Sequence, residues 1–290
     1  MLPFLLSLML AGMGLYGLLY AVNAYRRHCY VVDTPTSTVQ AVAMGLAEVQ
    51  GRAVPAEETI TSPFAEQPCL LCHYVCVYPR SEGTAFEAGT LGVPFYLEDD
   101  TGRLLVRPQG AAIRIPQHLT RLSSQFGAGV GDEHAPPATV QRFLKRKREG
   151  TLPELPSGRA ELLEFLTDQV GMTSSAPTGA PAGGTPRFVE ARLEPGDAAY
   201  VLGTAQSRAS ATVPAGATDR NEANLFIGAA PNSQGPFWSS YASVFEIASG
   251  SAEDLVDQSR REVRWQIGQG LLLFGAGLGC LALVLTQGCG

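Results

Sequence analysis

The sequence has few charged side chains: Asp, Glu, Lys and Arg make up only 17% of its 290 residues. The scarcity has a local cause, because residues 1–25 and 265–290 contain no charged side chain at all. The net charge of -6 is modest, so the composition gives no sign of a nucleic-acid partner. The charged residues lie between the two ends, where a folded domain is expected.

Sequence motifs of common enzyme classes are also missing. There is no Walker A sequence and no G-x-S-x-G elbow, and the glycine-rich run at 127–131 lacks the strand and helix that a phosphate loop needs. The four histidines are scattered without ligand spacing. We therefore name no catalytic residue and expect no cofactor.

The stretch P-C-L-L-C-H-Y-V-C-V-Y, residues 68–78, holds three of the six cysteines. In an extended strand Cys72 and Cys76 share one face about 13 Å apart, whereas a disulfide needs Cα atoms within about 7 Å. A zinc site would need a tight turn where Leu70-Leu71 stands, and two further ligands. We expect small buried side chains on a strand, and the weak metal candidates are Cys69, Cys72, His73 and Cys76.

The two charge-free ends are rich in Leu, Ala and Gly. Each is long enough to cross a bilayer core of roughly 30 Å as a helix, which predicts transmembrane helices at 1–25 and 265–287. A signal peptide is the weaker alternative at the first, which has no basic region. We expect a juxtamembrane helix at 251–264. We expect Gly275 and Gly279 to pack the second helix against the first rather than against another copy of the chain, because both segments belong to one chain.

The arginines near these ends predict an orientation. Arg26 and Arg27 follow the first apolar segment, and Arg260, Arg261 and Arg264 precede the second. Positive residues stay on the cytoplasmic side of a membrane. The sequence therefore predicts an integral membrane protein whose middle is cytoplasmic and whose termini both lie on the opposite side.

The middle of the chain shows short β-rich segments separated by Gly and Pro. This pattern predicts a mainly β fold, a small barrel or sandwich of the α+β type, bracketed by the two apolar helices. One or two amphipathic helices are expected, at 139–149 and 158–170, and the composition of 171–186 is that of a flexible insertion. Strands are expected at 44–54, 69–78, 187–193, 198–205, 225–229 and 241–247, with a hairpin at 95–106.

A basic cluster lies on the first of these amphipathic helices. Near an anionic lipid surface each basic residue gains about 1 kcal/mol, so the cluster is a candidate for docking to a membrane surface. A solvated helix face explains it equally well. The residues concerned are Arg142, Lys145, Arg146, Lys147 and Arg148.

Three further segments carry a family resemblance. They are G-L-A-E-V-Q-G at 45–51 followed by Ser62-Pro63 and Pro68-Cys69, the hairpin F-Y-L-E-D-D-T-G-R-L-L-V-R at 95–107, and L-E-P-G-D-A-A-Y-V-L-G-T-A at 193–205. Together they resemble the GIDE domain, also called the BAM (beside a membrane) domain, which implies such a domain at 29–250. The resemblance implies scaffold positions, required for turns rather than chemistry, at Gly51, Pro63, Pro68, Cys69, Gly102, Gly196 and Gly203.

The best-known relatives of that domain are mitochondrial membrane-anchored E3 ubiquitin and SUMO ligases that also carry a RING. This sequence has no Cys/His array for two zinc ions, so the resemblance carries over the domain and not the transferase chemistry. We expect a non-catalytic module that recognises an unknown protein or lipid ligand at the cytoplasmic membrane surface, without nucleic acid. The alternatives are a ubiquitin-transferase-like role, a cysteine-dependent reaction, and an oligomeric membrane scaffold.

Overall fold

The computed structural model describes residues 2–80, 83–115, 118, 120–122, 138–156, 187–207, 222–230, 244–250 and 252–287. The chain divides into two units, a pair of long helices from its two ends and a β-rich unit from the residues between them. The helix expected at 158–170 and the insertion expected at 171–186 lie outside the described residues.

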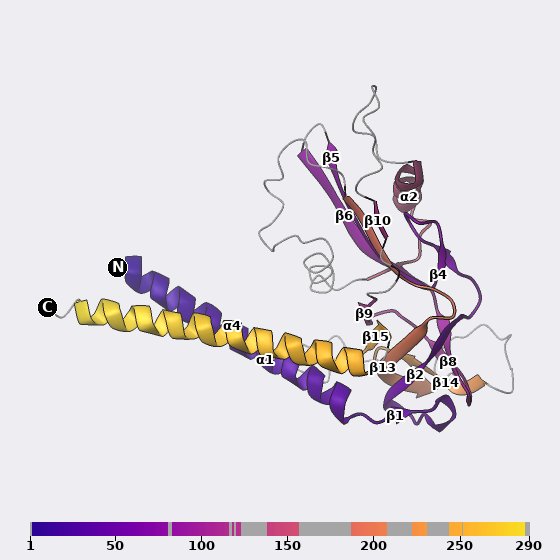
Figure 1. Ribbon diagram of the computed structural model, residues 1–290, viewed down its shortest axis with the longest axis horizontal. Helices are drawn as coiled ribbons and strands as arrows, with labels where there is room; N and C mark the ends of the chain where they lie inside the picture. The colour runs from indigo at the N-terminus through magenta and orange to yellow at the C-terminus, as the bar shows by residue number, and fades with distance from the viewer. Residues whose placement is uncertain are drawn as a thin grey trace. The chain divides into compact units, whose positions relative to one another are not determined.

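The helical unit consists of α1 (Leu2–Asp33) and α4 (Ala252–Gln287), which run antiparallel (Figure 1). Glycines set their closest approach: a side chain on Gly14 would collide with the backbone of Phe274, and one on Gly277 with the backbone of Ala11. The two helices of one chain therefore pack against each other, as expected. The contact does not use Gly275 or Gly279, because a Cβ at either would have nothing within 4 Å.

The expectation of two transmembrane helices is wrong. Among the described residues, no helix combines the length and the apolar character needed to cross a membrane. An uncharged stretch is not always an apolar one, because glycines and polar side chains such as Gln266 and Gln269 lower its mean hydropathy. The spans at 1–25 and 265–287, the juxtamembrane assignment of 251–264, and the integral-membrane localisation with its orientation are therefore corrected.

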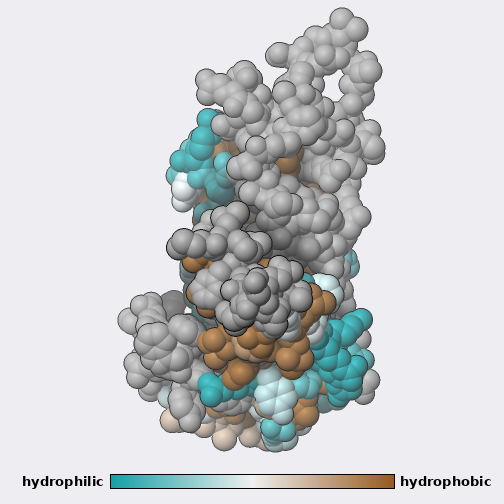
Figure 2. Space-filling model, turned by 90° about the vertical axis from the view of Figure 1, so that its left-hand side faces the viewer, coloured by the Kyte–Doolittle hydropathy of each residue, from teal (hydrophilic) through white to brown (hydrophobic). Residues whose placement is uncertain are grey.

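Large apolar side chains are nevertheless exposed along both helices. In Figure 2, which looks onto the side where α1 begins and α4 finishes in Figure 1, brown residues gather near the centre of the view. A contiguous apolar surface of this kind is uncommon on a monomeric protein. The most exposed examples are Met9, Tyr16, Trp265 and Leu272.

The β-rich unit is built around a closed barrel of five strands: β2 (Gly45–Pro55), β7 (Phe95–Asp99), β8 (Gly102–Val106), β14 (Glu222–Gly228) and β13 (Ala198–Ser207). The barrel closes because β2 pairs with both β7 and β13. All neighbours are antiparallel except β8 and β14, which run parallel. Counted in chain order, the five strands follow the order 1-2-3-5-4-1, which is the arrangement of an OB-fold barrel.

Alternate residues of these strands fill the barrel, including Val49, Phe95, Leu97, Leu104, Val201 and Ile227. Two glycines lie where the interior is narrow. A Cβ on Gly203 would lie 2.6 Å from Phe245 and 2.7 Å from Ile227, and one on Gly51 would lie 2.5 Å from the backbone oxygen of Glu98. Close packing thus explains both glycines.

Three short strands extend the barrel sheet, and one 3-10 helix accompanies them. They are β1 (Thr36–Ser37), the 3-10 helix η1 (Val39–Ala41), β15 (Glu246–Ser249) and β9 (Ala112–Arg114). β1 pairs with β2, β15 pairs with β13, and β9 pairs with β15. The carboxylate of Asp99 connects η1 to the barrel. It accepts the backbone N–H groups of Thr101 and Gly102 in the β7–β8 turn, and it accepts the N–H of Val39 in η1 at 2.8 Å.

A second sheet is inserted into two connections of the barrel. Its order is β10 (Thr120–Leu122), β12 (Arg187–Leu193), β5 (Leu71–Arg80), β6 (Gly83–Gly92) and β11 (Glu154–Leu155). The connection from β2 to β7 supplies β5, β6 and the small pair β3 (Ile60–Thr61) and β4 (Pro68–Cys69). The connection from β8 to β13 supplies the other strands and helix α2 (Ala138–Arg148).

Most strands agree with the sequence pattern. The barrel strands near 44–54, 95–106, 198–205 and 225–229, the strand at 187–193 and the helix near 139–149 are all present, with ends shifted by a few residues. The segment 69–78 is divided, since β4 ends at Cys69 and β5 begins at Leu71. Strand β6 was not expected, because its three glycines weaken the β signal.

Replacing Gly203 with valine should destabilise the barrel. The added side chain would overlap Phe245 and Ile227, and overpacking of this kind costs about 1–3 kcal/mol. Chemical unfolding of the Gly203→Val variant measures the loss. Ala198→Val, on the same strand but exposed, should change stability by no more than about 0.5 kcal/mol. Equal effects of the two substitutions would contradict the packing account.

Candidate functional site

Helix α2 lies on the second sheet with its apolar side inward. Val140 and Phe143 are buried, and the Phe143 ring meets that of Tyr74 edge-on at 4.7 Å between centroids. The helix ends at Arg148, and Gly150, whose φ of +66° suits glycine, lies two residues beyond it. The N–H of Gly150 donates to the oxygen of Lys147, and that of Thr151 donates to the oxygen of Arg146. The last turn carries four basic residues, whose positive charges interact favourably with the negative end of the helix dipole.

Lys147 is the one member of the basic cluster that turns inward. Its ammonium group donates to the Tyr74 hydroxyl at 2.8 Å and to Glu87 at 2.9 Å, and it lies 3.7 Å from Glu154. Burial would lower the pKa of Lys147, but these two hydrogen bonds outweigh it and raise that pKa. Burial also raises the pKa of Tyr74 to about 12. Lys147 is therefore a structural anchor rather than a surface group.

The other four cations face outward. The side chains of Arg142 and Lys145 are 66% and 73% exposed, and Arg146 and Arg148 are exposed as well. Arg142, Lys145 and Arg146 follow helical spacing on the side opposite Val140 and Phe143. We call these three residues the basic face of α2. They form a compact cationic surface held on a rigid support.

The basic face stands out against an acidic chain. The whole chain carries a net charge of -6, and α2 contributes +5 with no acidic residue, so the remaining residues together carry -11. Two carboxylates lie next to the basic face: Glu66 contacts Arg142 at 2.8 Å, and Glu149 lies 3.9 Å from Lys145. Positive charge is thus concentrated on one short helix.

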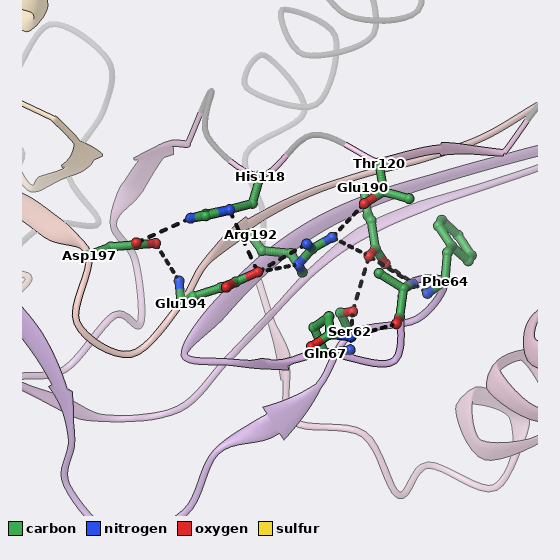
Figure 3. A network of polar contacts seen from close by, with 10 residues as sticks. Ser62, Phe64, Gln67, His118, Thr120, Glu190, Arg192, Glu194 and Asp197 are labelled. Carbon is green, nitrogen blue, oxygen red and sulfur yellow. Dashed lines mark hydrogen bonds and ion pairs between the residues drawn. The ribbon is translucent and has the colours of Figure 1, made fainter.

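A loop at 62–67 borders the basic face, and the carboxylate of Glu190 holds it (Figure 3). Glu190 is fully buried on β12 and accepts hydrogen bonds from Ser62 Oγ at 3.0 Å, Phe64 N–H at 2.7 Å and Ala65 N–H at 3.0 Å. The Phe64 ring in turn packs against Phe143 of α2, with centroids 6.1 Å apart. One buried carboxylate therefore positions both the loop and the helix beside it.

Arg192 balances the charge of Glu190. Its guanidinium group lies 2.7 Å from Glu190, 2.6 Å from Thr120 Oγ1 and 3.0 Å from Glu194 (Figure 3). Glu190, Arg192 and Glu194 are alternate residues of one strand and its end, so they share a face of the sheet. The pairing satisfies both charges where water is excluded, as buried ions require.

His118 lies at the far end of this network, at the surface. Its Nε2 is 3.1 Å from Asp197, and its Nδ1 is 3.7 Å from Glu194 (Figure 3). Each ring nitrogen faces a different carboxylate, so the three groups do not converge on one point. Among the described residues, no three His, Cys, Asp or Glu side chains are placed to hold a metal ion together.

The cysteines singled out in the sequence are core residues. Cys69, Cys72 and Cys76 are completely buried and pack among Leu91, Phe188 and other apolar side chains. Burial raises the pKa of Cys76 to about 12, and burial likewise raises the pKa of the Cys72 thiol. Buried thiols with raised pKa values are poor nucleophiles, which argues against a cysteine-dependent reaction at Cys72 or Cys76.

His73, the fourth metal candidate, joins the two sheets. Its Nε2 donates to the backbone oxygen of Ile113 on β9 at 2.8 Å, because a carbonyl can only accept. Its Nδ1 lies 2.7 Å from Thr90 Oγ1 and accepts that hydroxyl proton. Burial lowers the pKa of His73, so the neutral ring is the form that the fold stabilises.

The positions that the resemblance implies are spread over turns and strands. Gly51 and Gly203 lie in the barrel, and Pro63, Pro68 and Cys69 belong to the 62–67 loop and β4 beside it. Gly102 donates its N–H to Asp99 at 3.0 Å in the β7–β8 turn. Gly196 has a φ of +95° in the turn before β13, where its N–H meets the oxygen of Ala53 at 2.7 Å.

Sequence reasoning missed Glu66, Glu190 and Arg192. The alternation of Glu190, Arg192 and Glu194 in a strand was a usable signal, because opposite charges on one face of a buried strand imply pairing. Nothing local marks Glu66, whose partner is 76 positions further along the chain.

Comparisons with protein-family models, with curated proteins and with solved structures find no match for this chain. The resemblance to the GIDE domain therefore stays a prediction.

The free energy of unfolding should fall as the pH drops below about 6.5. The folded state lowers the pKa of His73 from its ordinary value of 6.5, so the unfolded chain takes up the proton first. The contribution of His73 is complete above that pH and is lost as the pH falls through the lowered value. Urea unfolding of the protein and of His73→Gln between pH 5 and 8 measures this. The difference between the two should shrink towards acid, and a difference independent of pH would contradict the assignment.

Native Cys72 and Cys76 should resist thiol reagents. Both are buried with raised pKa values, so modification must wait for local opening. Cys280 is exposed and provides an internal control that should react at once. Mass spectrometry after a brief pulse of iodoacetamide, with and without denaturant, reads out each site. Rapid native labelling of Cys72 or Cys76 would restore the cysteine-dependent alternative.

Proposed function

We propose that this chain is a non-catalytic binding module that recognises a short acidic segment of a protein partner through the basic face of α2. The observation that carries the proposal is that Arg142, Lys145 and Arg146 are presented outward on a helix whose opposite side is anchored in a core. A rigid support keeps the cations in place, so that little conformational entropy is lost when a ligand binds.

The size of the ligand follows from the surrounding charge. The residues outside α2 carry a net charge of -11, which repels a long polyanion or an extended anionic surface. Exposed charges act over about 8 Å at physiological salt, so a short acidic segment can contact the basic face without sensing most of that repulsion. This argument favours an acidic peptide over lipid or nucleic acid.

The residue types suit carboxylates. Two of the three cations are arginines, and the planar guanidinium group forms paired hydrogen bonds with a carboxylate. Glu66 already places one carboxylate oxygen 2.8 Å from the guanidinium group of Arg142, so a carboxylate can reach this site.

The barrel offers a less suitable surface. OB-fold barrels often bind oligonucleotides or oligosaccharides on the face of their second and third strands. Here the outward side chains of that region, Tyr96, Leu105 and Phe226, are only 7–9% exposed. Neither of the two aromatic rings among these described side chains is open for a base or sugar to stack on.

The proposal predicts that a labelled octaglutamate peptide binds the full chain at low ionic strength. Fluorescence anisotropy should show binding that weakens about tenfold when Arg142, Lys145 and Arg146 are all changed to Gln, since each exposed pair contributes about 0.5 kcal/mol. The matched control changes three exposed arginines of α4, Arg260, Arg261 and Arg264, to Gln, and should retain the affinity.

Two further probes test the class of partner. An octaglutamine peptide should not bind. A single-stranded oligonucleotide and vesicles containing phosphatidylserine should bind more weakly than octaglutamate does. If the oligonucleotide or the vesicles bind more strongly than octaglutamate, and the triple α2 variant loses that binding, the ligand is nucleic acid or lipid rather than an acidic segment. Equal loss in both triple variants would show a non-specific charge effect and refute the proposal.

A further inference from the structure

The loop at 62–67 holds Glu66 in an unusual backbone conformation. The φ of Glu66 is +55°, in the left-handed region that non-glycine residues rarely adopt. Its neighbours force this conformation, because Ser62 and Ala65 are bonded to Glu190 and Gln67 N–H donates to Ser62 Oγ at 3.1 Å. Such strain persists only where the surrounding structure fixes it.

The fixed loop directs the Glu66 carboxylate at the basic face. Its Oε1 lies 2.8 Å from the guanidinium group of Arg142. The two side chains are 46% and 66% exposed, so the pair forms in contact with water and adds little to stability. The loop has a stronger connection to α2 through the buried rings of Phe64 and Phe143. The ion pair is therefore not needed to hold the helix.

We infer that Glu66 is a built-in competitor that occupies Arg142 until an acidic ligand displaces it. This inference rests on the proposed function and concerns the regulation of the same surface. The Glu66 carboxylate has the chemistry of the ligand, and it is held at the position that one ligand carboxylate would take. Binding then exchanges one carboxylate for another at Arg142, and the cost of releasing Glu66 lowers the apparent affinity.

The exchange also selects among ligands. A ligand with one carboxylate gains nothing at Arg142 beyond what Glu66 supplies, whereas a run of acidic residues engages Lys145 and Arg146 as well. The pair thus favours ligands with several adjacent carboxylates over single acids, which are abundant in any cell.

The test is the Glu66→Gln variant of the full chain, titrated with labelled octaglutamate. The substitution keeps the size of the side chain and removes its charge, so the apparent affinity should rise about two- to fivefold, as expected for one exposed ion pair. Glu149→Gln removes the same charge beside Lys145, where the separation is 3.9 Å, and should change the affinity less. In an Arg142→Gln background, Glu66→Gln should have no effect.

Each outcome separates the two proposals. If the native chain binds octaglutamate and Glu66→Gln leaves the affinity unchanged or lowers it, Glu66 is not a competitor. The proposed function would still stand. Equal gains in affinity from Glu66→Gln and Glu149→Gln also overturn the competitor role of Glu66, since they would reflect only the loss of one negative charge near the basic face. Absence of binding in the native chain and in Glu66→Gln refutes both. Chemical unfolding serves as the folding check, and a large loss of stability in Glu66→Gln would instead show a structural pair.

Discussion

The carboxylate of Glu190 connects the parts of the candidate site. A buried charge is costly unless it is paired and fully hydrogen-bonded. Glu190 meets both conditions through Arg192 and three donors from the loop at 62–67. Its position on β12 joins a strand from the second half of the chain to a loop from the first. The loop then positions Phe64 against α2, so that the geometry of the basic face depends on an ion that lies outside it.

The barrel and the inserted sheet have different structural roles in the β-rich unit. The barrel provides a closed, narrow core in which close packing requires glycine at Gly51 and Gly203. Closure of the barrel also leaves few strand edges open. The second sheet is made only from the two long connections and supports α2. His73 joins the two sheets by its hydrogen bond to Ile113 on β9, while Thr90 on the neighbouring strand β6 bonds the other ring nitrogen. The proposed recognition surface therefore belongs to the insertion, whereas the barrel supplies the larger core.

Local patterns in the sequence predicted what depends on local forces. Short β-rich segments between Gly and Pro marked the barrel strands and the β7–β8 hairpin, and an amphipathic pattern marked α2. Local patterns could not separate Lys147 from the other cations, because its partners Tyr74, Glu87 and Glu154 come from other elements. Strand β6 was hidden by glycines, of which Gly89 is needed beneath the Tyr74 ring. The terminal helices were misassigned as membrane spans because absence of charge was equated with hydrophobicity.

The pairing of β12 with β5 has a kinetic consequence. The partners are 110 to 122 residues apart along the chain, whereas β5 and β6 are joined by a tight hairpin. Pairs so distant in sequence pay a large loop-closure entropy before they gain any contact, and such contacts form slowly. The surface formed by the loop and α2 is therefore completed late in folding, after the hairpin that supports it.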